Sequence, residues 1–435
     1  MANVTIVVHD LVRARMAAPS IRCVEMAREL AAHDHSVTLA IPNPPEIDLE
    51  PVRQVRDQGA EFDAVLRQSD VVITGGGPYP EPVDRVPPGI PHVIDMTFPL
   101  LLEALAMHRS DPRSWPERRL LEFTQRMSQR LLAADLLLCA STEQRHFYLG
   151  WLAALGRLTG HLSDADPAVD ELLRVVPFGC SSTPATSTGD GARHRIDGVA
   201  DGDYVILWSG NISEWYDPET VIRAVHEASP RVPNLRLVFI GANPKDERLG
   251  RTPVGLRARS LAVELGLAGR HVFFWDEWTP YATRADWLLD ADAAVIAAPC
   301  TLEAELSVRA RFLDYVWCAT PLLTTRGGTF ADEVLRAGLG IVVAPGDVAA
   351  MAAAMVAMAD ADTRELMRGR LRAIRPKYEW SQTLAPLLAF CASPRRAPDR
   401  RPEVPSVVDT DDPGRAAGLL RAALGRAAAW ARTSQ

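Results

Sequence analysis

The chain has 435 residues, 47% of them hydrophobic and 23% charged, as in an ordinary globular protein. This length is too great for one hydrophobic core and suits two domains of roughly 200 residues each. The formal net charge of −8 disfavours a nucleic-acid-binding surface, although local basic sites for a small anion remain possible.

The six cysteines are scattered, without a C-x-x-C pair or a His/Cys cluster of zinc spacing, so we expect free thiols in a reducing cytosol and no metal site. The N-terminus has no charged n-region and apolar h-region of a signal peptide. No apolar run approaches 18 residues, which predicts a cytoplasmic protein without a transmembrane segment. Peripheral membrane contact stays open.

The first half of the sequence alternates between apolar runs and helical patterns, which predicts a parallel sheet covered by helices. Predicted helices cover 20–35, 99–109 and 115–134, and a capping box of Ser141 and Gln144 opens another. The predicted strands are 3–10, 36–42, 70–77, 92–96 and 135–141.

Residues 175–203 are rich in Gly, Ser, Thr and Pro, so we place a domain boundary near 179–203. Alternation then restarts and predicts a second doubly wound domain. Its expected strands are 204–211, 235–241, 271–276, 293–299, 321–325 and 340–345, with helices at 217–228, 254–267, 281–291, 307–319, 330–337 and on to about 360.

These patterns divide the chain into five parts. Residues 1–180 form an N-terminal Rossmann-like domain on the acceptor side, and 203–376 a C-terminal Rossmann-like domain that binds the donor. Residues 377–390 are a helix that crosses back to the first domain. The Pro-rich and charge-rich stretch 391–414 is a flexible linker, and 415–435 a short Ala-rich C-terminal helix.

The stretch "ELSVRARFLDYVWCATPLLTT", residues 305–325, predicts a buried helix from Ser307 to Ala319 with a polar stripe. Val308, Phe312 and Val316 repeat at helical spacing and form the packing face. The helix follows the strand 293–299, so its N-terminus lies at the carboxyl end of the sheet, where ligands of doubly wound proteins bind.

The stripe and the helix N-terminus fit a nucleoside diphosphate. Unpaired amides of Val308 and Arg309, the Ser307 hydroxyl and the charges of Arg309 and Arg311 suit a diphosphate, and Asp314 suits ribose hydroxyls. The alternative is a solvated helix face in which Arg311 and Asp314 form a local salt bridge.

At these residues the sequence resembles glycosyltransferase family four, the retaining GT-B enzymes that use nucleotide sugars. The family signature has two Glu separated by seven residues, followed by small or apolar residues and a Pro. Here "DYVWCATP" supplies Asp314 and Pro321, and Glu305 lies nine positions before Asp314 instead of eight. The resemblance covers about 200 residues of the second half, including "LWSGNISEWYDPETVIRAV" at 207–225.

The resemblance implies a GT-B fold, with two doubly wound Rossmann-like domains facing across a cleft, and no cofactor or divalent metal. It places Gly210 and Asn211 at the donor, in a loop that lacks the family's basic pair. It places Trp278 at the nucleobase, and Asp95 and Glu305 at catalytic positions. A buried Asp95 held by loop amides and simple aromatic packing of Trp278 are the alternatives.

The function implied is that of an NDP-sugar dependent, hexosyltransferase-type enzyme that acts on a sugar, lipid-linked or natural-product acceptor in polysaccharide or natural-product assembly. High Ala, Arg and Gly content is typical of a GC-rich bacterium. Two alternatives remain: a catalytically silent homologue that binds nucleotide or scaffolds a partner, and a pseudo-glycosyltransferase with a non-sugar donor.

Overall fold

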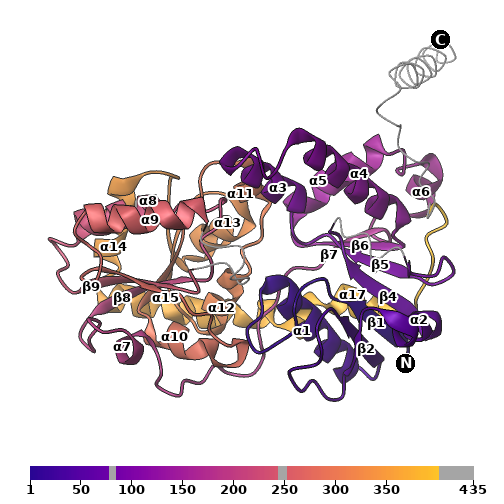
Figure 1. Cartoon of the computed structure of the whole chain (residues 1–435), viewed down its shortest axis with the longest axis horizontal. Coiled ribbons are helices and arrows are strands. Elements are labelled where there is room, and N and C mark those ends of the chain that lie inside the picture. The colour runs from indigo at the N-terminus through magenta and orange to yellow at the C-terminus, as the bar shows by residue number, and fades with distance from the viewer. Residues whose placement is uncertain (78–84, 243–251, 401–435) are drawn as a thin grey trace, which may run out of the picture.

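The structure is a computed structural model that describes residues 1–77, 85–242 and 252–400. Within them the chain forms two α/β domains, which lie side by side in Figure 1. The seven-stranded sheet of the N-terminal domain has the order β3-β2-β1-β4-β5-β6-β7, and the six-stranded sheet of the C-terminal domain has the order β10-β9-β8-β11-β12-β13. All pairs are parallel, so both domains are doubly wound as predicted.

The N-terminal domain is built around strands β1, β4, β5 and β6, which are buried along most of their length. Its strands are β1 Asn3–Val7, β2 Ser36–Ile41, β3 Arg53–Arg56, β4 Val71–Gly75, β5 His92–Asp95, β6 Leu136–Cys139 and β7 Leu173–Val175. Its helices are α1 Ala18–Ala32, α2 Gly59–Gln68, α3 Leu100–Ser110, α4 Glu117–Ala133, α5 Thr142–Ala154 and α6 Gly160–Ala165.

The C-terminal domain has helices on both faces of its sheet; in Figure 1 α8 and α9 lie above it and α10 lies below. Its strands are β8 Tyr204–Ser209, β9 Leu235–Ile240, β10 Val272–Trp275, β11 Ala293–Ile296, β12 Leu322–Thr325 and β13 Gly340–Val343. Its helices are α7 Ala192–Arg195, α8 Pro218–Ala228, α9 Pro253–Glu264, α10 Arg284–Asp290, α11 Leu302–Leu306, α12 Arg311–Trp317, α13 Gly328–Ala337, α14 Val348–Ala357 and α15 Ala361–Ile374.

The strands missed in the sequence analysis lie at the edges of the N-terminal sheet. β3 reads RQVR and buries one of its four residues, and β7 has only three residues. An edge strand is covered by fewer neighbours than a central strand, so a continuous apolar run is not required of it. In the N-terminal sheet, apolar runs therefore identified only the five inner strands.

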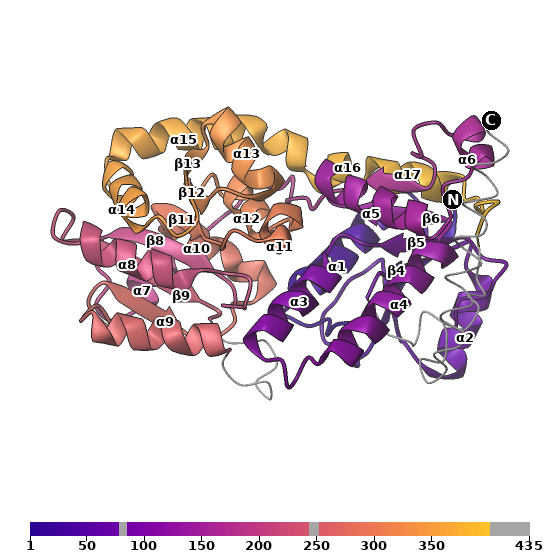
Figure 2. The same cartoon turned by 90° about the horizontal axis from the view of Figure 1, so that it is seen from above.

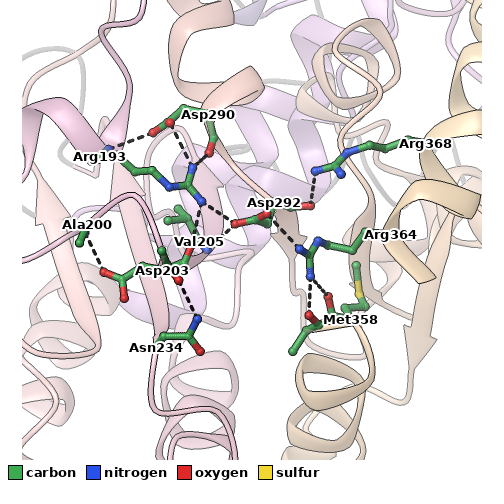
Figure 3. A network of polar contacts seen from close by, with 12 residues as sticks. Arg193, Ala200, Asp203, Val205, Asn234, Asp290, Asp292, Met358, Arg364 and Arg368 are labelled. Carbon is green, nitrogen blue, oxygen red and sulfur yellow. Dashed lines mark hydrogen bonds and ion pairs between the residues drawn. The ribbon is translucent and has the colours of Figure 1, made fainter. Parts of the chain in front are cut away.

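Charged side chains fasten the amino ends of β8 and β11 (Figure 3). The carboxylate of Asp292 accepts hydrogen bonds from Arg193 Nη2 at 2.7 Å and from the Val205 backbone N–H at 3.0 Å. Arg364, on α15, forms an ion pair with the same carboxylate at 3.2 Å. These contacts join α7 and α15 to the two central strands of the sheet, at the amino ends of the strands.

Aromatic side chains join the two domains on the side where the chain crosses back. Trp380 packs against Phe178, with ring centroids 5.7 Å apart, and Tyr378 packs edge-on against Phe312 at 6.1 Å. The helices α16 Trp380–Thr383 and α17 Ala385–Ala392 follow, and Figure 2 shows them along the N-terminal domain. This apolar contact is continuous with the cores of both domains.

The segment after α17 corrects the prediction of a flexible linker at 391–414, as far as it is described. Arg400 forms an ion pair with Asp135 at 2.6 Å, and Asp399 one with Arg157 at 2.9 Å. Charges that suggested solvation in the sequence have buried partners in the N-terminal domain, because the chain returns to it. The remaining linker residues and the predicted helix at 415–435 lie outside the described residues.

We expect Arg400→Ala to destabilise the protein by about 3–5 kcal/mol, because it leaves the carboxylate of Asp135 buried without its cation. The two side chains are 3% and 0% exposed. Urea unfolding measures the loss, and Arg126→Ala, exposed on α4, is the control. A change at Arg400 within 0.5 kcal/mol of the control would contradict the buried pairing.

Candidate functional site

The candidate site lies at the carboxyl end of the C-terminal sheet, where the strand order reverses between β8 and β11. β8 ends at Ser209 and is followed by Gly210, whose φ of +99° is readily adopted only by glycine. Gly241, just after β9, has a φ of +60°. A Cβ on Gly241 would lie 3.7 Å from the Gly210 Cα and 3.9 Å from the indole nitrogen of Trp278. The two glycine turns at Gly210 and Gly241 and the indole ring of Trp278 therefore lie close together.

Arg311 reaches this place from α12. Its guanidinium packs over the ring of Tyr216, 4.5 Å from the centroid, and a Cβ on Gly210 would lie 3.0 Å from Nη2. Nη2 donates to the carbonyl of Asn211 at 3.4 Å, and Nη1 is buried without a hydrogen-bond partner. Among the residues that the structure describes, no carboxylate lies within 4.0 Å of it. A half-buried cation without a carboxylate partner, one of whose donors is buried and unpaired, fits a site for an anionic ligand.

The structure corrects the predicted helix at 307–319. α11 ends at Leu306, and α12 begins only at Arg311. Ser307 is the C-cap of α11, and its backbone N–H donates to the Glu303 carbonyl at 2.8 Å. Val308 is 6% exposed, as expected of the packing face, although it is not helical. Ser307, Val308 and Arg309, which were predicted to form the N-terminus of one helix, therefore lie between two short helices.

The side chain of Arg309 also differs from the prediction, since it is already paired. Nη1 and Nη2 donate to the two carboxylate oxygens of Glu303 at 2.8 and 2.7 Å. The two side chains are 10% and 1% exposed. This is a buried bidentate ion pair, so Arg309 has little charge left for a ligand. Glu303 was not singled out in the sequence, because a separation of six residues is not a helical pairing distance.

Asp314 pairs with Arg284 and not with Arg311, so the local salt bridge of the alternative interpretation does not form. Arg284 Nε donates to Asp314 Oδ1 at 2.7 Å. The guanidinium of Arg284 lies between the rings of Tyr281 and Trp317, 3.8 and 4.2 Å from their centroids. These contacts fix the orientation of the carboxylate, which keeps 28% of its surface exposed.

Asp95, predicted to be catalytic, makes its contacts with Arg22 and Thr97 in the N-terminal domain. Its carboxylate accepts from Arg22 Nε at 2.6 Å, and the two side chains are 8% and 1% exposed. Thr97 also donates to it. The contacts are those of a buried structural ion pair within the N-terminal domain, close to the alternative that the sequence left open.

Glu305 is exposed on α11. Beside it, a small cavity lies between α11, the end of β12 and α13, and Ser307, Thr325 and Phe330 are among the residues that line it. Gly328, at the start of α13, could not carry a Cβ, which would lie 2.9 Å from the Ala304 carbonyl oxygen. The structure therefore places Ser307 against β12 and α13, separate from the contacts of Arg311.

The domain interface brings a further carboxylate, Glu103 of α3, close to the Glu303–Arg309 pair. Burial, reinforced by the negative charge of Glu303, raises the pKa of Glu103 to about 7, and Arg309 opposes that rise. The sequence gave no signal for Glu103, because its neighbours come from the other domain.

No group of three metal-ligating side chains occurs within residues 1–77, 85–242 and 252–400. Nor does any helix in these ranges have the length and apolarity needed to cross a membrane.

Comparison with solved structures identifies the architecture. Sucrose-phosphate synthase of Thermosynechococcus elongatus superposes with a TM-score of 0.60 at 17% identity, over 90% of this chain and 100% of the other. HepE of Anabaena, solved in complex with UDP-glucose, superposes with a TM-score of 0.60 at 14% identity, over 89% and 100% of the two chains. The fold is GT-B.

Sequence comparison concerns the C-terminal half. Residues 203–361 match the family described as Glycosyl transferases group 1. A D-inositol 3-phosphate glycosyltransferase of Acidothermus cellulolyticus is 29% identical over 239 residues, which are 52% of this chain. The alignment spans 49% of that relative. The matched residues cover most of the C-terminal domain and include Gly210, Trp278 and Arg311.

We expect Gly210→Ala to displace Arg311, because the new Cβ would lie 3.0 Å from its guanidinium and would strain a backbone at φ +99°. The strain costs roughly 1–3 kcal/mol. Gly202→Ala is the matched control, since nothing lies within 4 Å of its added Cβ. Urea unfolding of both variants tests this, and an equal stability of the two would rule out the strained close approach.

We expect Glu103→Gln to gain stability relative to wild type as pH rises from 5 to 8. A raised pKa means that Glu103 keeps its proton in the folded state at pH values where the unfolded state has released it. The contribution of this carboxyl to the stability of the wild-type protein is therefore complete below pH 4.5 and is lost as pH rises through 7. The difference should grow by about 1 kcal/mol or more. Unfolding at several pH values measures it, and Glu227→Gln, exposed on α8, is the control. Parallel curves for Glu103→Gln and wild type would contradict the shift.

Proposed function

We propose that this protein is a retaining glycosyltransferase that transfers a sugar from a nucleoside diphosphate donor to an acceptor held by the N-terminal domain. The observation that carries the proposal is Arg311: a half-buried guanidinium, without a carboxylate partner in the described ranges, that faces the glycine turn at the switch point of a glycosyltransferase group 1 domain.

The contacts support a specific division of roles. The diphosphate binds against Gly210, where the backbone is bare, and its negative charge is neutralised by Arg311. Trp278 lies beside the nucleobase. Asp314, oriented by Arg284, accepts hydrogen bonds from the ribose hydroxyls. Arg311 thus supplies the positive charge that the loop after β8 lacks in this sequence.

The reaction needs charge stabilisation and the exclusion of water. As the glycosidic bond breaks, charge develops on the leaving diphosphate, and a cation already in place stabilises it without reorganisation. The acceptor hydroxyl attacks from the same face of the sugar, so the anomeric configuration is retained. Closure of the two domains excludes water that would otherwise hydrolyse the donor.

We assign Glu305 to the sugar side of this site, and Asp95 to the structure of the acceptor domain.

A second candidate is a catalytically silent homologue that binds nucleotide. The observation in its favour is the Arg309–Glu303 pair, which leaves Arg311 as the cation for two phosphates. The two candidates differ in product formation. Release of nucleoside diphosphate from a sugar donor distinguishes an enzyme from a binding protein.

Thermal unfolding with UDP-, GDP-, dTDP- and ADP-glucose, and with the free diphosphates, tests donor binding. A ligand at 100 times its Kd stabilises by about 2.7 kcal/mol. We expect Arg311→Ala to weaken binding at least tenfold and Arg311→Lys to restore only part of it, because a point charge cannot reproduce the planar contact. Arg223→Ala, exposed on α8, is the control. Unchanged binding by Arg311→Ala would refute the donor assignment.

A further inference from the structure

One buried side chain connects the two domains beside the candidate site. Gln144, in the first turn of α5, is 1% exposed. Its Nε2 donates to the carbonyl of Thr97 in its own domain and to the carbonyl of Leu306 in the C-terminal domain, both at 2.8 Å. Its Oε1 accepts from the Ala140 backbone N–H at 2.7 Å. Both N–H donors of the amide are thus used, one in each domain.

The carbonyl of Leu306 needs this partner because of where α11 ends. Carbonyls in the last turn of a helix have no intrahelical donor, and α11 stops at Leu306. Gln144 supplies the missing donor from the other domain. A carboxylate of the same shape could not, because it has only acceptors, and one of its oxygens would face the carbonyl oxygens of Thr97 and Leu306.

Neighbouring contacts make this a defined interface. Glu143, adjacent in the same turn, accepts from Thr329 Oγ1 of α13 at 2.5 Å. α3 and α5 both pack against α11, and the four helices α3, α5, α11 and α13 meet between the domains in Figure 1. Of the two polar links from α5, the one made by Gln144 is buried and the one made by Glu143 is exposed.

The segment held in this way leads directly into the site. Leu306 directly precedes Ser307, and Arg311 lies four residues after Ser307. We propose that Gln144 is a positioning residue: its carboxamide fixes the end of α11 against the acceptor domain and so sets the closed arrangement in which transfer takes place. This inference rests on the proposed function. It concerns the arrangement of the two domains, whereas the contacts of Arg311 with Tyr216 and Asn211 lie within the C-terminal domain.

The experiment compares Gln144→Ala and Gln144→Glu with wild type, and uses Gln125→Ala on α4 as the matched control. Binding is measured by thermal unfolding with UDP, ADP and GDP, and transfer by nucleoside diphosphate release from the corresponding glucose conjugates. Small-angle scattering gives the radius of gyration. We expect nucleotide affinity to change less than threefold, kcat to fall at least tenfold, and the radius of gyration to increase, with Gln144→Glu the more severe.

The outcomes separate this inference from the proposed function. If wild type neither binds nor turns over any of these nucleotides, the proposed function fails. If wild type is active and both Gln144 variants keep its kcat and radius of gyration, the positioning role is refuted. Should the Gln144 variants fail to fold, Thr329→Ala tests the same interface from the other domain, and a wild-type kcat in that variant refutes the inference.

Discussion

The buried ion pair between Glu303 and Arg309 is the interaction on which the candidate site depends. Two hydrogen bonds of 2.8 and 2.7 Å hold Arg309 back against α11. The chain between α11 and α12 is therefore a folded-back connection instead of a helical turn. This connection places Arg311 over Tyr216, where it faces the turn after β8. Without the pair, two arginines would compete for the same anionic ligand, and a carboxylate would lie unpaired in the interface.

The same logic explains why most candidate charges in this protein do not point to function. Arg22 is committed to Asp95, and Arg400 to Asp135. Each pair is largely removed from water and therefore stays together for structural reasons. Arg311 differs because a carbonyl and aromatic faces surround it. The absence of a carboxylate around it, within the described ranges, is what makes it a site candidate.

The two domains are joined by contacts of different kinds on opposite sides of the interface. On the crossing side, Trp380 and Tyr378 pack on aromatic rings and make one continuous apolar core. On the other side, where α3 and α5 pack against α11, the amide of Gln144 makes a buried hydrogen bond between the domains. Apolar packing tolerates small rotations better than a directional hydrogen bond, so this division favours a closing movement about the aromatic side.

The sequence by itself determined the two doubly wound sheets, and it named Gly210 and Arg311 as candidate donor contacts. Apolar periodicity and glycine turns are local signals, and a ladder of parallel strands follows from them. Tertiary structure alone decided which carboxylate meets which guanidinium. Glu303 and Arg309 are six residues apart, Arg284 and Asp314 are thirty apart, and Gln144 and Leu306 belong to different domains. Such pairings depend on where the chain folds back and on how well each charge is desolvated, and no periodicity in the sequence records either.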